Sequence, residues 1–101
     1  MPYDLGDSPS FKRSVKSLDP QQKEIIKQGL NALLIYFSTN NNLSEAQKIA
    51  PRFFFKQLRC KPFYEVGIEG KLRIVLRKEG NTLTTVLAGN HDQVNRFLSQ
   101  A

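Results

Sequence analysis

The side chains best suited to chemistry in this sequence are basic, and they are concentrated in one stretch. Between Arg52 and Lys78 the chain has eight lysines and arginines against two acidic residues, which gives this stretch a net charge of +6. The whole chain has the same net charge, so the flanking segments are nearly balanced. A localised basic region is typical of proteins that bind nucleic acid or an acidic partner. The alternative is a solvated charged face without a ligand.

Four side chains offer more than charge. Arg73 and Arg77 carry planar guanidinium groups that stay charged and bind phosphate in a bidentate manner. Glu65 adds a carboxylate, and His91 is the sole histidine. Histidine is the side-chain type whose ordinary pKa lies closest to neutrality, so His91 is the best candidate for proton transfer. With one histidine and the single cysteine Cys60, no zinc-ligand set or internal disulfide is indicated, and no metal or cofactor is expected.

Alternating apolar residues predict the strands that carry these groups. The two apolar sets are Tyr64, Val66 and Ile68, then Leu72, Ile74 and Leu76. Both sets share one sheet face only if Val66 pairs with Ile74 in a hairpin closed by residues 69–71. Arg73 and Arg77 then lie on the opposite face, with Glu65 diagonal to both. The pattern therefore predicts a carboxylate bracketed by two guanidinium groups.

Two helix starts precede the basic stretch. Ser8 before Pro9, and Asp19 before Pro20, each place an N-cap residue ahead of proline at the first helical position. Apolar residues at helical spacing after the second start predict a helix that runs to about Thr39. The sequence therefore predicts a pair of helices before the sheet.

The connector between these helices and the sheet has weaker signals. Ser44 and Gln47 have the spacing of a capping box, so one helical turn is expected between residues 43 and 51. The aromatic-rich residues 53–59 then read as the first strand of the main sheet.

The C-terminal part combines a strand and a helix. Residues 82–88 are apolar on both faces, which predicts a central strand covered on both sides. Asn90 is a suitable N-cap for a final helix. If that helix packs over Leu83 and Leu87, His91 comes to the mouth of the face that holds the arginines.

These elements predict a single domain. A chain of 101 residues is long enough for about one core. The expected fold class is α+β, with two N-terminal helices packed on a mainly antiparallel sheet of three to five strands and a short C-terminal helix. The sequence has no signal-peptide pattern and no apolar run of the roughly 18 residues that span a membrane. We therefore expect a cytoplasmic protein without membrane contact.

Several pieces, in their order and spacing, carry a resemblance to a known family. They are Ser10–Leu18, Lys56–Leu58, Tyr64–Val66, Gly70–Leu76 and Gly89–Asp92. Over nearly its whole length the chain resembles the RelE/ParE superfamily of toxins from bacterial type II toxin–antitoxin pairs, and the branch that holds RelE, HigB and YafQ is favoured. The resemblance also implies a short N-terminal strand, which residues 2–5 could supply. No tyrosine or tryptophan follows Tyr64, and this departs from the family pattern.

The resemblance implies an endoribonuclease, or mRNA interferase, that cuts ribosome-bound mRNA without a metal and so inhibits translation. Its partner would be an antitoxin protein, in a heterotetramer or larger complex. Two alternatives stay open: a ParE-like inhibitor of DNA gyrase without catalysis, and a non-toxic basic module that binds RNA or another partner.

RNA cleavage through the 2′-hydroxyl needs a base, an acid and cations at the phosphate. His91 can serve as acid or base, Arg73 can stabilise charge, and Glu65 is the second proton-transfer candidate. Further phosphate-binding residues are Arg77, Lys71, Arg59, Lys56 and Lys61. Each role has a structural alternative: His91 as a surface or capping residue, the arginines as contacts to an acidic antitoxin, and Glu65 as a counter-charge.

Overall fold

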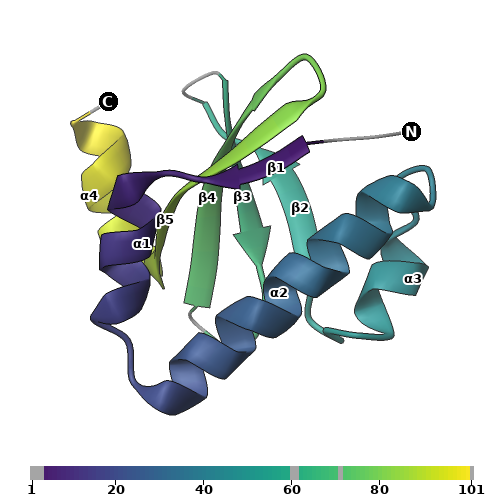
Figure 1. Cartoon of the computed structure of the whole chain (residues 1–101), viewed down its shortest axis with the longest axis horizontal. Coiled ribbons are helices and arrows are strands. Elements are labelled where there is room, and N and C mark those ends of the chain that lie inside the picture. The colour runs from purple at the N-terminus through teal and green to yellow at the C-terminus, as the bar shows by residue number, and fades with distance from the viewer. Residues whose placement is uncertain (1–3, 60–61, 71, 101) are drawn as a thin grey trace.

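The computed structural model describes residues 4–59, 62–70 and 72–100, and these form five strands and four helices. In chain order they are β1 (Asp4–Asp7), α1 (Pro9–Lys16), α2 (Pro20–Ser38), α3 (Leu43–Gln47), β2 (Phe54–Gln57), β3 (Phe63–Gly67), β4 (Leu72–Glu79), β5 (Thr82–Asn90) and α4 (His91–Ser99) (Figure 1). The predicted α+β class is confirmed. Among the described residues, no helix combines the length and apolar character needed to cross a membrane.

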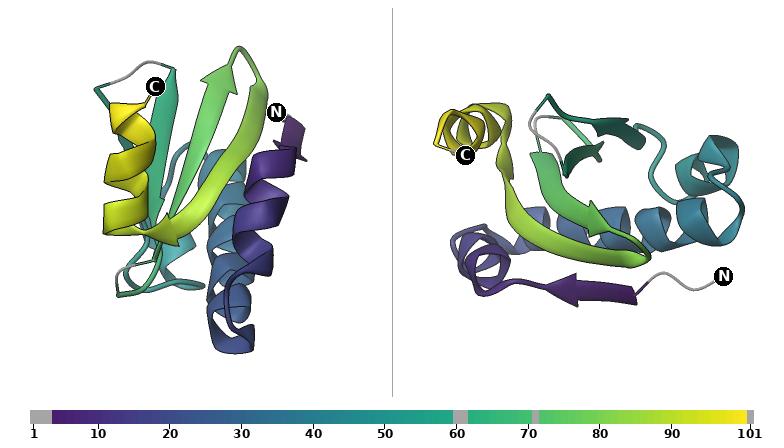
Figure 2. Two further views of the ribbon diagram at one scale, coloured as in Figure 1. Left: turned by 90° about the vertical axis from the view of Figure 1, so that its left-hand side faces the viewer. Right: turned by 90° about the horizontal axis from the view of Figure 1, so that it is seen from above.

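The strands form one mixed sheet in the order β1-β5-β4-β3-β2. Only the β1–β5 pair is parallel among these neighbours, and the other pairs are antiparallel. Helices α1 and α2 cover one face of the sheet, whereas α4 lies on the other face (Figure 2). The N-terminal strand, expected at residues 2–5, runs from Asp4 to Asp7, and its expected first two residues lie outside the described part.

The helix starts agree with the capping signals. Ser8 Oγ accepts a hydrogen bond from the Phe11 amide at 3.1 Å, and Asp19 Oδ1 accepts one from the Gln22 amide at 2.8 Å. Each bond satisfies an amide that has no partner inside the helix. Helix α2 ends at Ser38, one residue before the predicted end.

Helix α3 starts differently from the prediction. Its N-cap is Asn42, whose side chain accepts from the Glu45 amide at 3.3 Å, rather than Ser44. Asn40 and Asn41 both have positive φ, at 57° and 60°. This left-handed pair, which asparagine tolerates better than most residues, turns the chain so that Asn42 arrives in an extended conformation.

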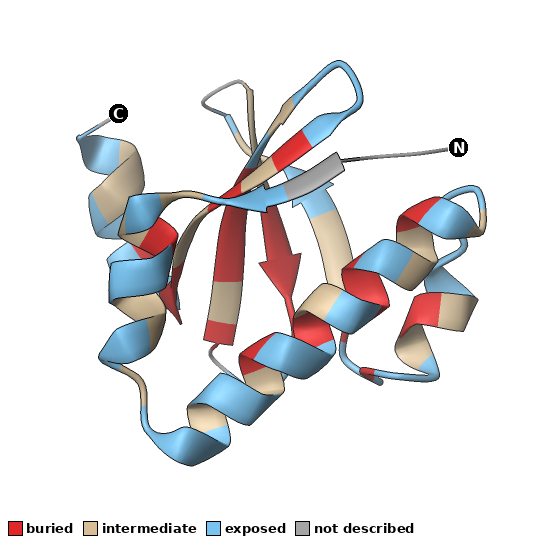
Figure 3. Ribbon diagram, viewed as in Figure 1, coloured by how far each residue is buried: buried red, intermediate tan, exposed pale blue. Residues whose placement is uncertain are grey.

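The predicted hairpin register is confirmed. Val66 pairs with Ile74 and Tyr64 with Leu76, so their side chains join the core under α1 and α2. The same core holds Phe53, which lies outside strand β2. Burial is concentrated at the centre of the sheet and along the inner side of α2 (Figure 3). Apolar alternation fixed this register because a slip by one residue would turn every core side chain to the other face.

Strand β5 contains a bulge that corrects one prediction. Val75 pairs with Leu87 and Leu76 with Thr85, which leaves Val86 without a partner on β4. The extra residue puts Leu83 and Leu87 on opposite faces. Leu83 joins the core beneath α1 and α2, so the expected packing of α4 over both leucines is wrong for Leu83.

Helix α1 uses the backbone around the bulge. Ser10 Oγ donates to the carbonyl of Val86 at 2.8 Å, and the amide of Ala88 donates to Ser14 Oγ at 2.9 Å. Both serines lie one helical turn apart and face β5. They supply hydrogen-bond partners to a carbonyl in the bulge and to an amide two residues beyond it.

Candidate functional site

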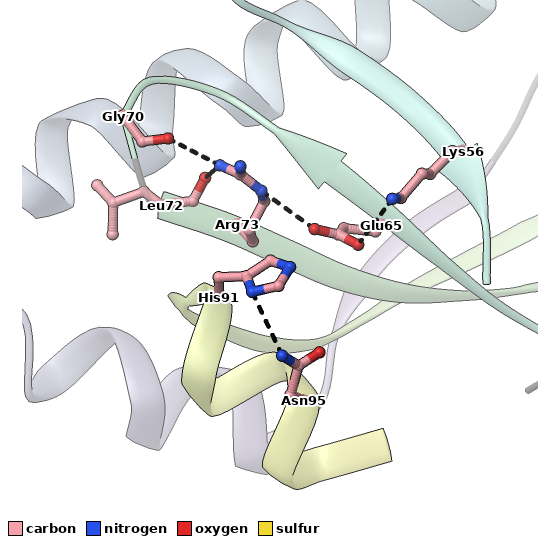
Figure 4. A network of polar contacts seen from close by, with 7 residues as sticks. All are labelled: Lys56, Glu65, Gly70, Leu72, Arg73, His91 and Asn95. Carbon is pink, nitrogen blue, oxygen red and sulfur yellow. Dashed lines mark hydrogen bonds and ion pairs between the residues drawn. The ribbon is translucent and has the colours of Figure 1, made fainter. Parts of the chain in front are cut away.

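The candidate site lies on the sheet face opposite α1 and α2. Pairing of Lys56 with Glu65, and of Phe54 with Gly67, places these residues on one face of β2 and β3. Arg73 pairs with Gly67 and joins them from β4. Helix α4 rises beside this face, and Figure 4 shows His91 at its start, next to the charged side chains. Three strands and one helix therefore build the site.

Glu65 is the buried centre of this charged group. Only 4% of its side chain is exposed. Its Oε2 lies 3.1 Å from Nε of Arg73, and its Oε1 lies 3.8 Å from Nζ of Lys56. The carboxylate is therefore flanked by two cations on the neighbouring strands.

The second cation differs from the prediction, which placed Arg77 beside Glu65. Arg77 instead extends toward Glu79, with Nε 3.0 Å from Oε1. Lys56 takes the place beside Glu65 because it is directly opposite in the β2–β3 pair, and direct cross-strand neighbours lie closer than diagonal ones. The sequence pattern did not assign β2 a register, so this neighbour was missed.

Arg73 is fixed by several contacts. Its Nη1 donates to the carbonyls of Gly70 at 3.0 Å and Leu72 at 2.8 Å. The Nε–H contacts Glu65 as an ion pair, but it is not aligned for a hydrogen bond. Nη2 makes no hydrogen bond within the described residues, although arginine has donors there. A held guanidinium with an unused donor edge is suited to an anionic ligand.

An aromatic ring supports the two cations. The Arg73 guanidinium carbon lies 5.2 Å, and Nζ of Lys56 lies 5.9 Å, from the centre of the Phe54 ring, within cation–π range. Gly67 makes room for this ring, because a methyl group at position 67 would overlap it. The sequence predicted Phe54 only as part of an aromatic-rich strand, and its spacing of two residues from Lys56 is the signal that places it on the charged face.

His91 stands between two open hollows. One, of about 410 Å³, is lined by Arg73, Asn90, His91 and Asp92. The other, of about 510 Å³, is lined by Lys56, Gln57, Leu58, Arg59, Glu65, His91, Asn95 and Leu98. His91 is exposed and begins α4 directly after Asn90, which is the predicted N-cap and forms a capping box with Gln93. The structure thus places His91, Arg73, Glu65, Lys56 and Arg59 around two neighbouring hollows that share His91, and these two hollows are called the groove below.

The other predicted phosphate-binding residues have different positions. Arg77 is exposed and pairs with Glu79 toward the far end of β4. Lys61 and Lys71 lie outside the described residues. In the described part of the chain no three histidine, cysteine, aspartate or glutamate side chains are grouped as a metal site would require.

Asn95 is a site residue that the sequence reasoning missed. Its Nδ2 lies 3.3 Å from Nδ1 of His91, and both residues are exposed on α4. The signal that could have found it is spacing, because residues four apart are neighbours on a helix surface.

Sequence comparisons identify no relatives: no family model matches this chain, and no curated protein matches it significantly. Solved structures do match. A metal-bound toxin from Helicobacter pylori has a TM-score of 0.62 at 20% identity, covering 92% of this chain and 99% of that chain.

Two further solved structures lead to the same fold. A chain of the RelB-RelE antitoxin-toxin complex from Methanococcus jannaschii has a TM-score of 0.62 at 13% identity, covering 90% of this chain and 95% of that one. YafQ from E. coli has a TM-score of 0.60 at 16% identity, covering 92% and 98%. The chain therefore has the RelE-like fold that the family resemblance implied.

Proposed function

We propose that this protein is the toxin of a toxin–antitoxin pair and a metal-independent endoribonuclease that cleaves ribosome-bound mRNA. One observation supports this most: His91, the sole histidine, lines one hollow with Arg73 and the adjoining hollow with Glu65 and Lys56. The RelE-like fold, shared with toxins of such pairs, supports the same reading.

The proposed reaction uses the 2′-hydroxyl of the RNA as the nucleophile. A base takes the 2′-hydroxyl proton, the oxygen attacks phosphorus, and the bond to the 5′-oxygen breaks as that oxygen receives a proton. The products are a 2′,3′-cyclic phosphate and a 5′-hydroxyl. His91 and Glu65 are the proton-transfer groups, and Arg73 stabilises the negative charge of the transition state.

The cations around the hollows would hold the RNA strand. Lys56 and Arg59 line the hollow beside His91, and both are exposed. They can contact phosphates on either side of the cleaved one, which positions the strand without reading its sequence. We assign Arg77 a smaller share of this binding, because its guanidinium pairs with Glu79.

The proposed function also requires a partner protein that blocks the basic, open groove. We propose an antitoxin protein that covers the groove with acidic side chains and thereby blocks RNA. Such complexes are known for the similar folds, including the DinJ-YafQ complex of E. coli.

The test is expression of the protein in bacteria, followed by translation and mRNA cleavage assays with purified protein and ribosomes. The wild type should stop translation and cut ribosome-bound mRNA. His91→Ala should lower the cleavage rate by about 100-fold or more, as expected when a proton-transfer group is lost. Arg96→Ala, an exposed arginine on the same helix, is the matched control and should cut normally.

The outcomes separate the alternatives. Full cleavage by His91→Ala would exclude the proposed catalytic role. Intact mRNA together with blocked gyrase supercoiling would identify a gyrase inhibitor. Harmless expression without either effect would leave a basic RNA-binding or interaction module.

A further inference from the structure

His91 has a polar neighbour that no proton-transfer scheme above uses. Asn95 Nδ2 lies 3.3 Å from His91 Nδ1, one helical turn along α4. Figure 4 shows the other ring nitrogen, Nε2, on the side of the ring that faces Glu65 and Lys56. The two nitrogens of His91 therefore have different environments: Nδ1 contacts the helix, and Nε2 faces the groove.

We infer that Asn95 is a positioning residue that fixes the tautomer and the orientation of His91. An amide nitrogen can only donate, so a hydrogen bond from Asn95 Nδ2 requires that Nδ1 be the acceptor. In a neutral imidazole the proton must then reside on Nε2. The contact also limits rotation of the ring and keeps Nε2–H directed into the groove.

This inference rests on the proposed function for its meaning, and it separates the roles of the two proton-transfer groups. A neutral His91 with its proton on Nε2 offers the groove a donor and no acceptor. It can donate a hydrogen bond to a phosphate oxygen, but it cannot take the 2′-hydroxyl proton at Nε2. The proton-transfer role of His91 in the proposed reaction is then that of the acid, in which the protonated ring gives its Nε2 proton to the departing 5′-oxygen. The base must be another group, and Glu65 is the carboxylate that lines the same hollow.

The opposite orientation of the Asn95 amide would favour the other mechanism. If the Asn95 amide were turned, its Oδ1 would accept from Nδ1–H, and Nε2 would become the acceptor that faces the RNA. His91 would then be suited to act as the base. The tautomer of this one ring therefore distinguishes the two mechanisms.

The tautomer can be measured without RNA. Because the chain has one histidine, the two-bond ¹H–¹⁵N spectrum of ¹⁵N-labelled full-length protein contains a single ring system. At a pH where the ring is neutral, the wild type should show a protonated Nε2 and an unprotonated Nδ1. A wild-type ring with its proton on Nδ1 would overturn the inference.

Two variants test the role of Asn95 itself. Asn95→Asp replaces the donor by a carboxylate that only accepts, so the proton of the neutral ring should move to Nδ1. Asn95→Leu removes the hydrogen bond at similar size and should shift both nitrogen resonances toward those of a free histidine. Ser99→Asp adds the same charge to exposed α4 two turns from His91 and should leave the tautomer unchanged.

Failure of the inference on Asn95 can be told apart from failure of the proposed nuclease function. If Asn95→Asp keeps the wild-type tautomer, Asn95 does not control His91, whatever the protein does to RNA. If the wild type cuts no RNA, the proposed function fails, while the spectra still decide how Asn95 acts on the ring. A circular dichroism spectrum like that of the wild type checks that each variant is folded.

Discussion

Arg73 Nε lies 3.1 Å from Oε2 of the buried Glu65, and this ion pair joins strands β3 and β4 at the floor of the groove. Loss of one partner from a buried pair leaves the other charge uncompensated, whereas exposed pairs contribute little. Glu65→Gln should therefore lower the free energy of unfolding by about 2 kcal/mol. Lys56→Ala, at a side chain 59% exposed, should cost less than about 0.5 kcal/mol. Urea unfolding measures both, and equal losses would contradict the prediction.

Glu65→Gln also separates a catalytic role from a counter-charge role. If Glu65 takes the 2′-hydroxyl proton, the amide should cut RNA about 100-fold more slowly or worse. RNA affinity should rise, because a negative charge beside Arg73 is gone. Single-turnover cleavage and equilibrium binding measure the two effects. Unchanged cleavage would leave Glu65 with only the counter-charge role.

Gly67 and Phe54 should be coupled. A methyl group at position 67 would overlap the Phe54 ring, so Gly67→Ala should push the ring from beneath Arg73 and lower stability by about 1 kcal/mol. RNA affinity should fall as well, because Arg73 loses its support.

A smaller residue at position 54 provides the control. Gly67→Ala combined with Phe54→Leu should regain part of the stability, because the branched side chain can avoid the methyl group. It should not regain RNA affinity, since no ring remains. Additive stability losses in this double-mutant cycle would show that the two positions are independent.

The start of α4 should matter for activity as well as stability. Asn90→Ala removes the 2.8 Å N-cap hydrogen bond from the Gln93 amide and should lower the free energy of unfolding by about 1 kcal/mol. His91 follows directly, so cleavage should fall by more than the unfolded fraction explains. Asn42→Ala removes the corresponding cap of α3, away from the site. It should lower the free energy of unfolding by a similar amount and leave cleavage unchanged. Equal cleavage rates for the Asn90→Ala and Asn42→Ala variants would show that the cap of α4 does not act through His91.

The salt dependence of RNA affinity should report the number of phosphates that the protein contacts. For a single strand, each lost contact lowers the slope of log affinity against log salt by about 0.7. Lys56→Ala and Arg59→Ala should each show this change, because both residues line the hollow beside His91. Arg77→Ala should change the slope less. Lys12→Ala, exposed on α1, is the control on the other side of the sheet. A larger effect at Lys12 would place the RNA on the wrong face.

Much of the fold followed from local signals. Capping side chains satisfy amides three residues away, so Ser8, Asp19 and Asn90 marked helix starts without knowledge of the rest of the chain. Strict alternation fixed the register of Val66 with Ile74, because any slip would expose the core face. Asn42 was not recognised as the N-cap of α3, because its place there depends on two preceding residues with positive φ.

The sequence alone predicted only part of the site. Alternation and helix capping determined that Arg73 and Glu65 share a sheet face and that His91 begins the last helix. Tertiary structure decided that Lys56, and not Arg77, flanks Glu65, and that the bulge at Val86 turns Leu83 away from α4. Local patterns specify which face a side chain takes. Which neighbours it meets there depends on how separate strands pair, bulge and pack, and no single segment carries that information.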